Sequence, residues 1–469
     1  MDTRLAPLAH VLDEKGLVTD PFAAEPYCRD ILKLYECRPL AVLRPRSTAE
    51  VAAAVRWAAA AGVAIVPQGG NSGLCGGASA AGAGDAVILS LERMRAVRSV
   101  DPVGNTMVVE AGVVLADAQA AAEAAGRRFA LTHGGAGQSR IGGNLSTNAG
   151  GNNALRFGTA RDQVLGIEAV LADGRVWDGL RLLRKNTAGY DLKQLFIGAE
   201  GTLGIITAAA LRLRPLARSR ATAVVALATP DAALGLLRRL EDGLGEVVEA
   251  FELISAAALD KALTIDGIRP PFAAAHPWLV LVEVATASPL LPIEAAFEDV
   301  LVAVAQDGLL ADAVVARSGA ERDGFWKLRE AIALACIEDP SCLRMDTAVP
   351  VAAVPDFIAG AEAAVAAVAP GARPLPYGHA GDGNIHFNIC RGEGMAHEAF
   401  RARWDEVEHA VFEVTLALGG TISAEHGIGR LKAGEFARTA PPLDLELMRV
   451  LKRALDPSAH LNPGAIFEP

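Results

Sequence analysis

The chain has 469 residues, of which 51 % are hydrophobic and 21 % charged, a globular composition long enough for two or three domains. Its net charge of −11 argues against a nucleic-acid-binding protein, which would carry a basic face. No run of eighteen uncharged apolar residues occurs, and the acidic N-terminus lacks the apolar core of a secretion signal, so we expect neither a transmembrane helix nor export. The six cysteines form no C-x-x-C pair and fit reduced thiols in a cytoplasmic protein.

The first half of the chain predicts short strands and helices around glycine-rich segments. After an N-terminal arm of about 40 residues, Ser47 and Glu50 have the spacing of a capping box before an alanine-rich helix. A buried strand at 63–67 then leads into the sequence QGGNSGLCGG. Residues 106–125 predict a strand followed by a helix, and strand-like runs return at 164–177 and 201–215.

The glycine density falls near residue 217, where a second domain is expected. Residues 230–244 predict an amphipathic helix, and residues 278–285 predict a buried strand. The predicted fold class is therefore α+β throughout, without internal repeats.

Two glycine clusters about seventy residues apart indicate a site for a diphosphate. Glycine lets successive backbone N–H groups approach an anion closely, although a single cluster of this kind is equally typical of ordinary turns. The chain has no G-x-G-x-x-G and no G-K dipeptide, so neither a Rossmann site nor a P-loop is predicted. The clusters consist of Gly69, Gly70, Gly73, Gly76 and Gly77, and of Gly142, Gly143, Gly150 and Gly151.

The segments PQGGNSGLCGGA, IGGNLSTNAGGNNALRFGTARDQVLGIEAVLADG and GAEGTLGIIT, in this order, resemble the FAD-binding domain of the vanillyl-alcohol oxidase superfamily. The resemblance implies that backbone amides of the two loops hold the FAD pyrophosphate and ribityl chain, and that Gly201 and Ile206 lie near the ring and the adenine. The implied FAD-binding residues of the two loops are Pro67, Gly69, Gly70, Asn71, Ser72 and Gly73, and Gly142, Gly143, Asn144, Thr147, Gly150 and Gly151.

Some relatives in that superfamily attach FAD covalently through a histidine. His133 lies close to the second loop in the sequence. We expect it to be a solvent-facing loop histidine and the FAD to be bound non-covalently.

The second half carries a histidine motif, YGHAGDGNIHF, and a later SAEHGIGR. The Gly-Asp-Gly-Asn turn predicts a hairpin that brings His379 and His386 together. With the carboxylate of Glu425 they form a nitrogen, nitrogen, oxygen set suited to zinc or another divalent metal that also holds a substrate. Taken alone, two such loop histidines are more often hydrogen-bonded surface residues than a metal pair.

GHAGDGNIHFN, SAEHGIGR and the terminal LNPGAIF resemble the D-2-hydroxyglutarate and D-lactate dehydrogenase branch of the superfamily. The resemblance implies that His379, His386 and Glu425 bind the metal and that His426 is the catalytic base. It also implies that Asn388 contacts the substrate and that Asn462 lies close to the flavin.

Two arginines complete the implied substrate site. FWKLREAIALA matches a segment whose arginine, here Arg329, grips the substrate carboxylate, and RMDTAVP places Arg344 where relatives usually have lysine. A guanidinium keeps the charge but can bind in a bidentate manner, so the pocket is not identical. Ala333 replaces the threonine of glutarate-specific relatives, which leaves the distal group of the substrate open.

The resemblance implies a vanillyl-alcohol oxidase-type FAD-binding domain at residues 1–217, an α+β substrate domain at 218–424 and a small helical segment at 425–469 that returns to the flavin. The implied reaction is oxidation of a D-2-hydroxy acid (D-2-hydroxyglutarate, D-malate or D-lactate) to the 2-oxo acid. Electrons would pass to an electron-transfer flavoprotein or a quinone-linked acceptor, and relatives are often homodimers. The alternatives are a subunit of a glycolate-oxidising complex, a metal-dependent hydrolase and a non-catalytic flavin-binding module.

Overall fold

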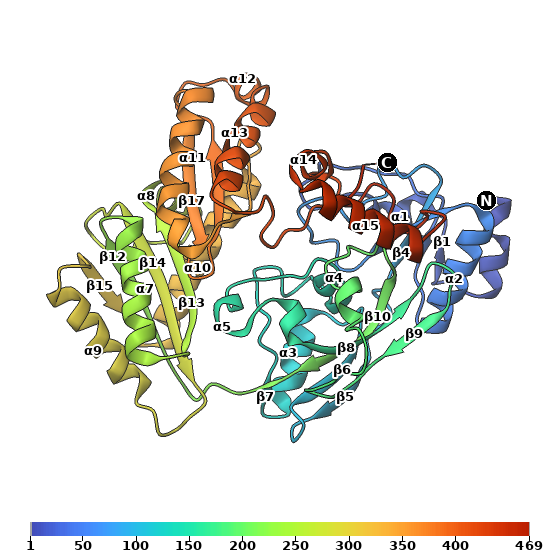
Figure 1. Ribbon diagram of the computed structural model, residues 1–469, viewed down its shortest axis with the longest axis horizontal. Coiled ribbons are helices and arrows are strands. Elements are labelled where there is room, and N and C mark those ends of the chain that lie inside the picture. Colours follow the sequence, from blue (N-terminus) through green and yellow to red (C-terminus); the bar gives the residue numbers. More distant parts are fainter. Residues whose placement is uncertain (1, 469) are drawn as a thin grey trace. The chain divides into compact units, whose positions relative to one another are not determined.

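A computed structural model describes residues 2–468, and the chain divides into two compact units. Unit 1 contains the residues up to 150, residues 159–216 and the residues from 425 onward, whereas unit 2 contains residues 151–158 and 217–424. The sequence predicts boundaries at 217 and 424. The short excursion at 151–158 is not among the predicted boundaries. Figure 1 gives the order of the elements along the chain.

Unit 1 is built from short strands and mostly short helices. Its elements are η1 (Thr3–His10), β1 (Leu17–Val18), α1 (Pro21–Cys28), β2 (Val42–Leu43), α2 (Thr48–Ala61), β3 (Ala64–Gln68), β4 (Ala86–Ser90), β5 (Val97–Asp101), β6 (Thr106–Glu110), α3 (Leu115–Ala124), β7 (Arg127–Arg128), α4 (Ile141–Ser146), η2 (Ala160–Gln163), β8 (Val164–Val170), β9 (Val176–Gly179), α6 (Lys193–Phe196), β10 (Ile205–Arg212), β11 (Arg214–Pro215), α14 (Ala433–Thr439) and α15 (Pro442–Leu455).

The strands of unit 1 form a four-stranded sheet of order β1-β2-β4-β3, a five-stranded sheet of order β5-β6-β10-β8-β9, and the pair β11-β7. The helix predicted after Ser47 is confirmed as α2, because the Ser47 side chain accepts a hydrogen bond from Glu50 N at 3.2 Å. The strand predicted at 63–67 is β3, and the strand and helix predicted at 106–125 are β6 and α3.

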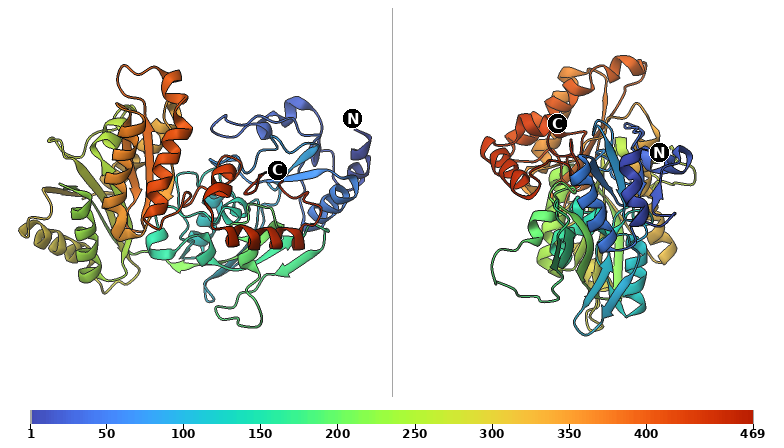
Figure 2. Two further views of the ribbon diagram at one scale, coloured as in Figure 1. Left: turned by 45° about the horizontal axis from the view of Figure 1, so that its top comes forward. Right: turned by 90° about the vertical axis from the view of Figure 1, so that its right-hand side faces the viewer.

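The C-terminal residues pack against the first sheet of unit 1. Leu461 forms a parallel bridge with Ile65 of β3, and Asn462 N donates to Ile65 O at 2.8 Å. Lys452 of α15 donates to the carbonyls of Leu461 and Thr202, both at 2.8 Å. Figure 2 shows the C-terminal segment beside the N-terminal strands, so the two ends of the chain belong to one folded body.

Unit 2 is an α+β body around one large sheet. Its elements are α5 (Ala154–Phe157), β12 (Ser219–Leu227), α7 (Pro230–Leu244), β13 (Val248–Ser255), α8 (Ala256–Ala262), β14 (Trp278–Thr286), α9 (Ile293–Gln306), β15 (Asp312–Val315), α10 (Gly319–Glu338), β16 (Thr347–Ala348), η3 (Val351–Ala353), α11 (Val354–Val368), β17 (Arg373–His379), β18 (Asn384–Cys390), α12 (His397–Arg401) and α13 (Trp404–Ala417).

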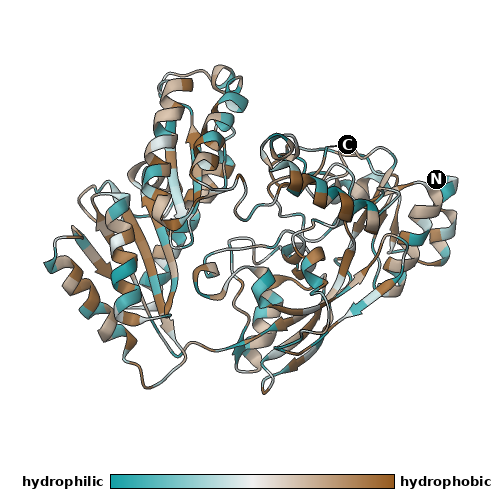
Figure 3. Cartoon of the chain, in the orientation of Figure 1, coloured by the Kyte–Doolittle hydropathy of each residue, from teal (hydrophilic) through white to brown (hydrophobic). Residues whose placement is uncertain are grey.

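The seven strands of unit 2 have the order β15-β12-β14-β13-β17-β18-β16. The central strands are apolar over most of their length, as Figure 3 shows, because both faces of the sheet are covered by helices. Helices α8 and α10 share one hydrophobic core with residues of β12, β13, β14 and β17. Helix α11 packs on the opposite face, where the rings of Phe357 and Phe387 lie 5.6 Å apart.

One helical stretch in unit 2, Val351–Val368, has the length and composition of a membrane span. Only 28 % of this window is buried, but Phe357, Ile358, Ala361 and Val365 are buried as in the core helix of a globular domain. A single helix of this kind is weak evidence for a membrane span. The expectation that the chain has no transmembrane helix therefore stays a prediction from the sequence.

Candidate active site

The two glycine clusters of unit 1 lie against each other. A Cβ atom added to Gly69 would lie 3.3 Å from the Cα of Gly143, and one added to Gly70 would overlap the carbonyl oxygen of Gln138. The Gln138 amide in turn donates to Gly70 O at 2.9 Å. Only glycine allows this close approach of two backbones, so both clusters are parts of one site.

The first cluster is a loop after β3, and the second begins as a helix. Asn71 has a φ of 52° and donates through its side chain to Arg29 O at 2.7 Å. Around Gly73 there is nothing within 4 Å of an added Cβ, and this glycine and its neighbour Ser72 lie at least partly exposed. Gly142 and Gly143 lie in the first turn of α4, where the Gly142 N–H donates to Ala111 O at 2.8 Å. The sequence predicts a loop there, and the structure has the short helix α4 in its place.

The remaining residues of the second cluster lie at the end of α4 and in the segment where the chain passes from unit 1 to unit 2. Asn144 is buried and donates to Ser139 Oγ at 3.2 Å, and Thr147 donates to Gly143 O at 3.3 Å. A Cβ added to Gly150 would lie 3.0 Å from Glu425 Oε2, so a predicted metal ligand lies beside this glycine segment within unit 1. Gly151 belongs to unit 2, where Arg156 of the same short segment pairs with Glu249 at 2.8 Å.

The remaining predicted FAD residues surround β3 and β10. Gly201 has a φ of 73°, and an added Cβ would lie 2.9 Å from Pro67 Cγ. Ile206 lies in the core formed around the five-stranded sheet. Asn462 donates to the carbonyls of Gly77 and Glu200 at 2.9 and 2.7 Å, which fixes the C-terminal segment next to the first cluster.

Glu200 was not singled out from the sequence, although it lies in the matched segment GAEGTLGIIT. Its carboxylate accepts hydrogen bonds from Ile428 N at 2.8 Å and from Gly429 N at 2.9 Å. Burial raises the pKa of Glu200, and the Gly429 N–H works in the opposite direction. Glu200 thereby anchors the chain that directly follows His426.

The expectation that His133 faces solvent is wrong. His133 is partly buried, accepts a hydrogen bond from Gly135 N at Nδ1 (3.1 Å), and lies 3.3 Å from Asn144 Oδ1. Burial lowers its pKa, and the ring is part of the hydrogen-bonded turn before α4.

In unit 2 the predicted residues lie on one face of a strand pair. Leu343 and Ile389 exchange both backbone hydrogen bonds, and Thr347 pairs with Ile385, so residues 342–348 run antiparallel to β18 in a single register. This register places Arg344 opposite Asn388 and Asp346 opposite His386. The predicted hairpin is confirmed as β17 and β18, and it adds Tyr377 and His379 to the same face.

The two predicted metal-binding histidines of unit 2 are brought together. The rings of His379 and His386 are 5.4 Å apart and nearly perpendicular. His379 Nδ1 lies 2.6 Å from Glu252 Oε1, and His386 Nδ1 lies 3.6 Å from Asp346 Oδ1. Carboxylates in these positions orient metal-binding histidines and increase their basicity.

Arg329 shares Glu252 with His379. Arg329 of α10 donates through Nε to Glu252 Oε2 at 2.7 Å, and its guanidinium lies 4.8 Å from the centre of the Tyr377 ring. Burial alone would raise the pKa of Glu252, but the charges and hydrogen bonds of His379 and Arg329 lower it to about 2. Because a guanidinium has five N–H donors, the bond to Glu252 uses only one of them.

Backbone groups hydrogen-bond to the side chains of Arg344 and Asn388. Arg344 Nη1 donates to Cys336 O at 3.1 Å, while Arg344 Nε is buried and has no acceptor among residues 2–468. Asn388 accepts a hydrogen bond from Met345 N at 3.2 Å, and its side-chain nitrogen lies 3.4 Å from Tyr377 Oη. A buried donor without an acceptor is costly, and a bound anion would relieve it.

Asp346 connects this face to the start of the C-terminal segment. It is fully buried and accepts hydrogen bonds from Asn384 Nδ2 at 2.9 Å and from Ala424 N at 3.1 Å. Glu425 and His426 follow Ala424 directly in the chain. The division between the two units falls between Ala424 and Glu425.

Sequence reasoning missed Glu252, Asp346 and Tyr377 as members of this face. Asp346 lies within the matched segment RMDTAVP, and Tyr377 opens the histidine motif. Glu252 is an acidic residue in the apolar strand AFELIS, and a charge in such a strand is the signal that it has a buried partner.

Two family models identify the class of this chain as a FAD-binding flavoprotein. The FAD binding domain family matches residues 39–179, and the C-terminal domain of FAD linked oxidases matches residues 216–466. The chain belongs to the FAD linked oxidase family and is an FAD-dependent oxidoreductase.

Curated relatives match over almost the whole chain. D-2-hydroxyglutarate dehydrogenase of Xanthomonas citri pv. viticola is 35 % identical over 100 % of this chain and 97 % of its own length. The mitochondrial D-2-hydroxyglutarate dehydrogenase of Bos taurus is 37 % identical over 98 % of this chain and 82 % of its own length.

Solved structures with the same fold are distant in sequence. A p-cresol methylhydroxylase with bound substrate superposes with a TM-score of 0.80 at 14 % identity, covering 100 % of this chain and 97 % of that one. An alkyldihydroxyacetonephosphate synthase gives a TM-score of 0.74 at 17 % identity, covering 99 % and 84 %. These likenesses confirm the predicted α+β, vanillyl-alcohol oxidase-type fold.

Proposed function

We propose that this chain oxidises a D-2-hydroxy acid to the 2-oxo acid with FAD and a divalent metal, and that D-2-hydroxyglutarate is the preferred substrate. The names of the full-length relatives support the substrate class. The observation that carries the proposal is the buried Arg344 Nε, which has no acceptor in the described part of the chain. It lies on the face that also holds Asn388 and His386.

A dianionic substrate suits the charges of this face. Arg329 already has a partner in Glu252, so it can bind one carboxylate without leaving a buried charge uncompensated when the pocket is empty. Arg344 has no carboxylate partner among residues 2–468 and would bind the second, distal carboxylate. A monocarboxylate such as D-lactate would leave the Arg344 donor unmatched.

The residues fit a divalent metal, and their nitrogen-rich set favours zinc. His379 and His386 would be ligands, and the carboxylates of Glu252 and Asp346 support their rings. Glu425 would add an oxygen ligand. When bound, the metal lowers the pKa of the substrate hydroxyl.

The residues also fit a non-covalently bound FAD. Backbone N–H groups of the paired glycine clusters would hold its diphosphate. When bound, FAD accepts the hydride that leaves C2 of the substrate. The tasks of this chain are to orient C2 and to remove the hydroxyl proton.

His426 is the proposed general base. It follows Glu425 directly, so one short segment would carry both a metal ligand and the proton acceptor. Glu200 fixes the backbone after His426 at Ile428 and Gly429, which limits the positions the imidazole can adopt.

Reduced FAD would pass its electrons to an electron-transfer flavoprotein or a quinone-linked acceptor. A glycolate-oxidising complex is the alternative setting for the same fold. The homodimer and the cytoplasmic location stay predictions from the sequence.

A substrate panel tests the proposal. We expect kcat/KM with a dye acceptor to be roughly ten- to hundredfold higher for D-2-hydroxyglutarate than for D-lactate, with D-malate and glycolate completing the panel. Arg344→Met should remove most of this preference and leave D-lactate oxidation nearly unchanged. A wild type that prefers D-lactate, or a variant that loses all acids equally, would contradict a distal carboxylate at Arg344.

Metal removal is the second test. After treatment with EDTA, turnover should be lost while the visible flavin absorbance stays, because the FAD-cluster glycines other than Gly151 lie in unit 1 and the two histidines in unit 2. Full activity after verified metal removal would contradict the proposed metal-assisted reaction.

A further inference from the structure

Three of the six cysteines lie together in unit 2, next to the candidate substrate residues. Cys336, Cys342 and Cys390 are all buried members of the core under α8 and α10, and all are free thiols. The mechanism proposed above uses none of them.

The backbone register sets Cys342 directly opposite Cys390. Leu343 N donates to Ile389 O at 2.9 Å, and Ile389 N donates to Leu343 O at 2.8 Å, so these two residues form a hydrogen-bonded antiparallel pair. The next pair outward in this register is Cys342 with Cys390, a non-hydrogen-bonded pair. In such a pair the Cα atoms are about 4.5 Å apart and the side chains lie on the same face.

This placement meets the geometric requirement of a disulfide. Disulfide-bonded cysteines have Cα atoms about 4.4–6.8 Å apart, and the register brings this pair into that range without movement of the backbone. The pKa values agree with close contact of the thiols: a hydrogen bond from Cys342 lowers the pKa of Cys336 to about 7, and the Cys336 and Cys390 thiols raise that of Cys342.

Cys390 is the last residue of β18 and lies beside an ion pair. Its Sγ lies 4.0 Å from Asp339 Oδ2, and Asp339 pairs with the Lys261 ammonium group at 2.5 Å. Cys390 is 8 % exposed and Cys342 1 %, so Cys390 is the first of the two that a small reagent meets.

We propose that Cys342 and Cys390 form a reversible disulfide by exchange with a low-molecular-weight disulfide. The Cys390 thiolate attacks one sulfur of the reagent, and one small thiol leaves with the proton that Cys390 gave up. The Cys342 thiol then loses its proton and attacks Cys390 Sγ, which releases the second small thiol. Two protein thiols are oxidised, and one small disulfide is reduced to two thiols.

The bond would close the strand pair two residues from Arg344 and Asn388. Residues 342, 344 and 346 alternate with the buried Leu343 and Met345, so the disulfide would lie on the same face as the candidate substrate residues. The two cysteines would form a thiol switch at the end of this face. Formation of the disulfide does not depend on the identity of the substrate.

Peptide mapping of the full-length protein tests the inference. The holoprotein is incubated with glutathione disulfide, remaining thiols are alkylated, and trypsin with Asp-N separates Cys342 in residues 339–344 from Cys336 and places Cys390 in residues 382–391. We expect these two peptides to be joined, to separate with dithiothreitol, and the free-thiol count to fall by two from six.

Variants make the assignment specific. The joined peptide should disappear in Cys342→Ser and Cys390→Ser and persist in the matched control Cys336→Ser. A Cys336–Cys342 or Cys28–Cys37 bond in its place, a glutathione adduct without closure, or no loss of thiols would overturn the proposal. Since the wild type is mapped first, a poorly folded variant does not remove the test.

Discussion

The glycine site of unit 1 and the histidine face of unit 2 are built in different ways. In unit 1, glycines at 69, 70, 142 and 143 bring main chain against main chain, and backbone amides of the clusters are the proposed ligand-binding groups. In unit 2, an antiparallel register lines up side chains, and buried carboxylates such as Glu252 orient them.

The difference teaches which mutations each region tolerates. A backbone site depends on the absence of side chains, so it fails by steric overlap. A side-chain site depends on charge and hydrogen-bonding partners, so it fails when one partner loses its charge while the fold persists. Binding of FAD and catalytic turnover should therefore be separable by mutation.

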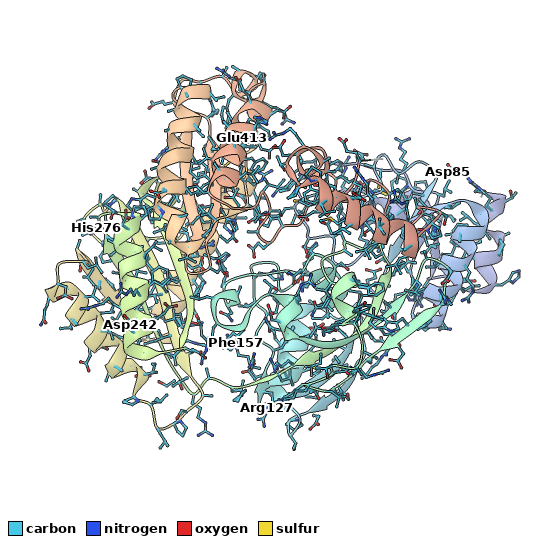
Figure 4. All side chains as sticks on the ribbon, viewed as in Figure 1. Asp85, Arg127, Phe157, Asp242, His276 and Glu413 are labelled. Carbon is cyan, nitrogen blue, oxygen red and sulfur yellow. The ribbon has the colours of Figure 1, made fainter. Side chains whose placement is uncertain are left out.

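The largest separation is expected for His426→Ala. Loss of the proposed general base should lower kcat by at least about a hundredfold while FAD and metal stay bound. Steady-state kinetics, flavin absorbance and metal content measure the three quantities. The matched control is His409→Ala, an exposed histidine on α13 that lies 3.7 Å from Glu413, which is labelled in Figure 4. A kcat of the variant within a few-fold of the wild-type value would show that another residue is the general base.

A smaller effect, confined to the histidine face, is expected for Glu252→Gln. The amide keeps the size of the side chain but loses the charge that holds His379 and Arg329, so metal affinity should fall by about 10- to 100-fold. FAD content should not change. Glu249→Gln is the matched control, since Glu249 lies on the same strand and pairs with Arg156 away from the histidines. Equal metal loss in both variants would show that the loss comes from a general disturbance of β13 and not from the contacts of Glu252.

The smallest effect, confined to the glycine site, is expected for Gly70→Ala compared with Gly73→Ala. The first substitution meets the Gln138 carbonyl and should lower the stability of the FAD-free protein by about 1–3 kcal/mol. The second has open space around it and should leave that stability unchanged. Denaturant unfolding of the FAD-free proteins separates the two, and an equal loss in both would show that crowding at Gln138 is not the cause.

The local elements of the fold could be predicted because their signals lie within a few residues. Ser47 caps α2, short apolar runs predict the buried strands β3 and β14, and the Gly-Asp-Gly-Asn turn specifies the hairpin of β17 and β18. The sequence predicts a loop at Gly142 and Gly143, whereas the structure has helix α4 there, because Ile141 and Leu145 are buried in the core of unit 1.

The sequence by itself determined the residue types of both sites, because motifs such as GHAGDGNIH and the glycine clusters carry their chemistry in adjacent positions. Only the tertiary structure decided which side chains support them. Glu252 is 127 residues from His379 in the chain, and Cys342 meets Cys390 only through the pairing of Leu343 with Ile389. Such partners are chosen by strand register and burial, and register is a property of the assembled sheet.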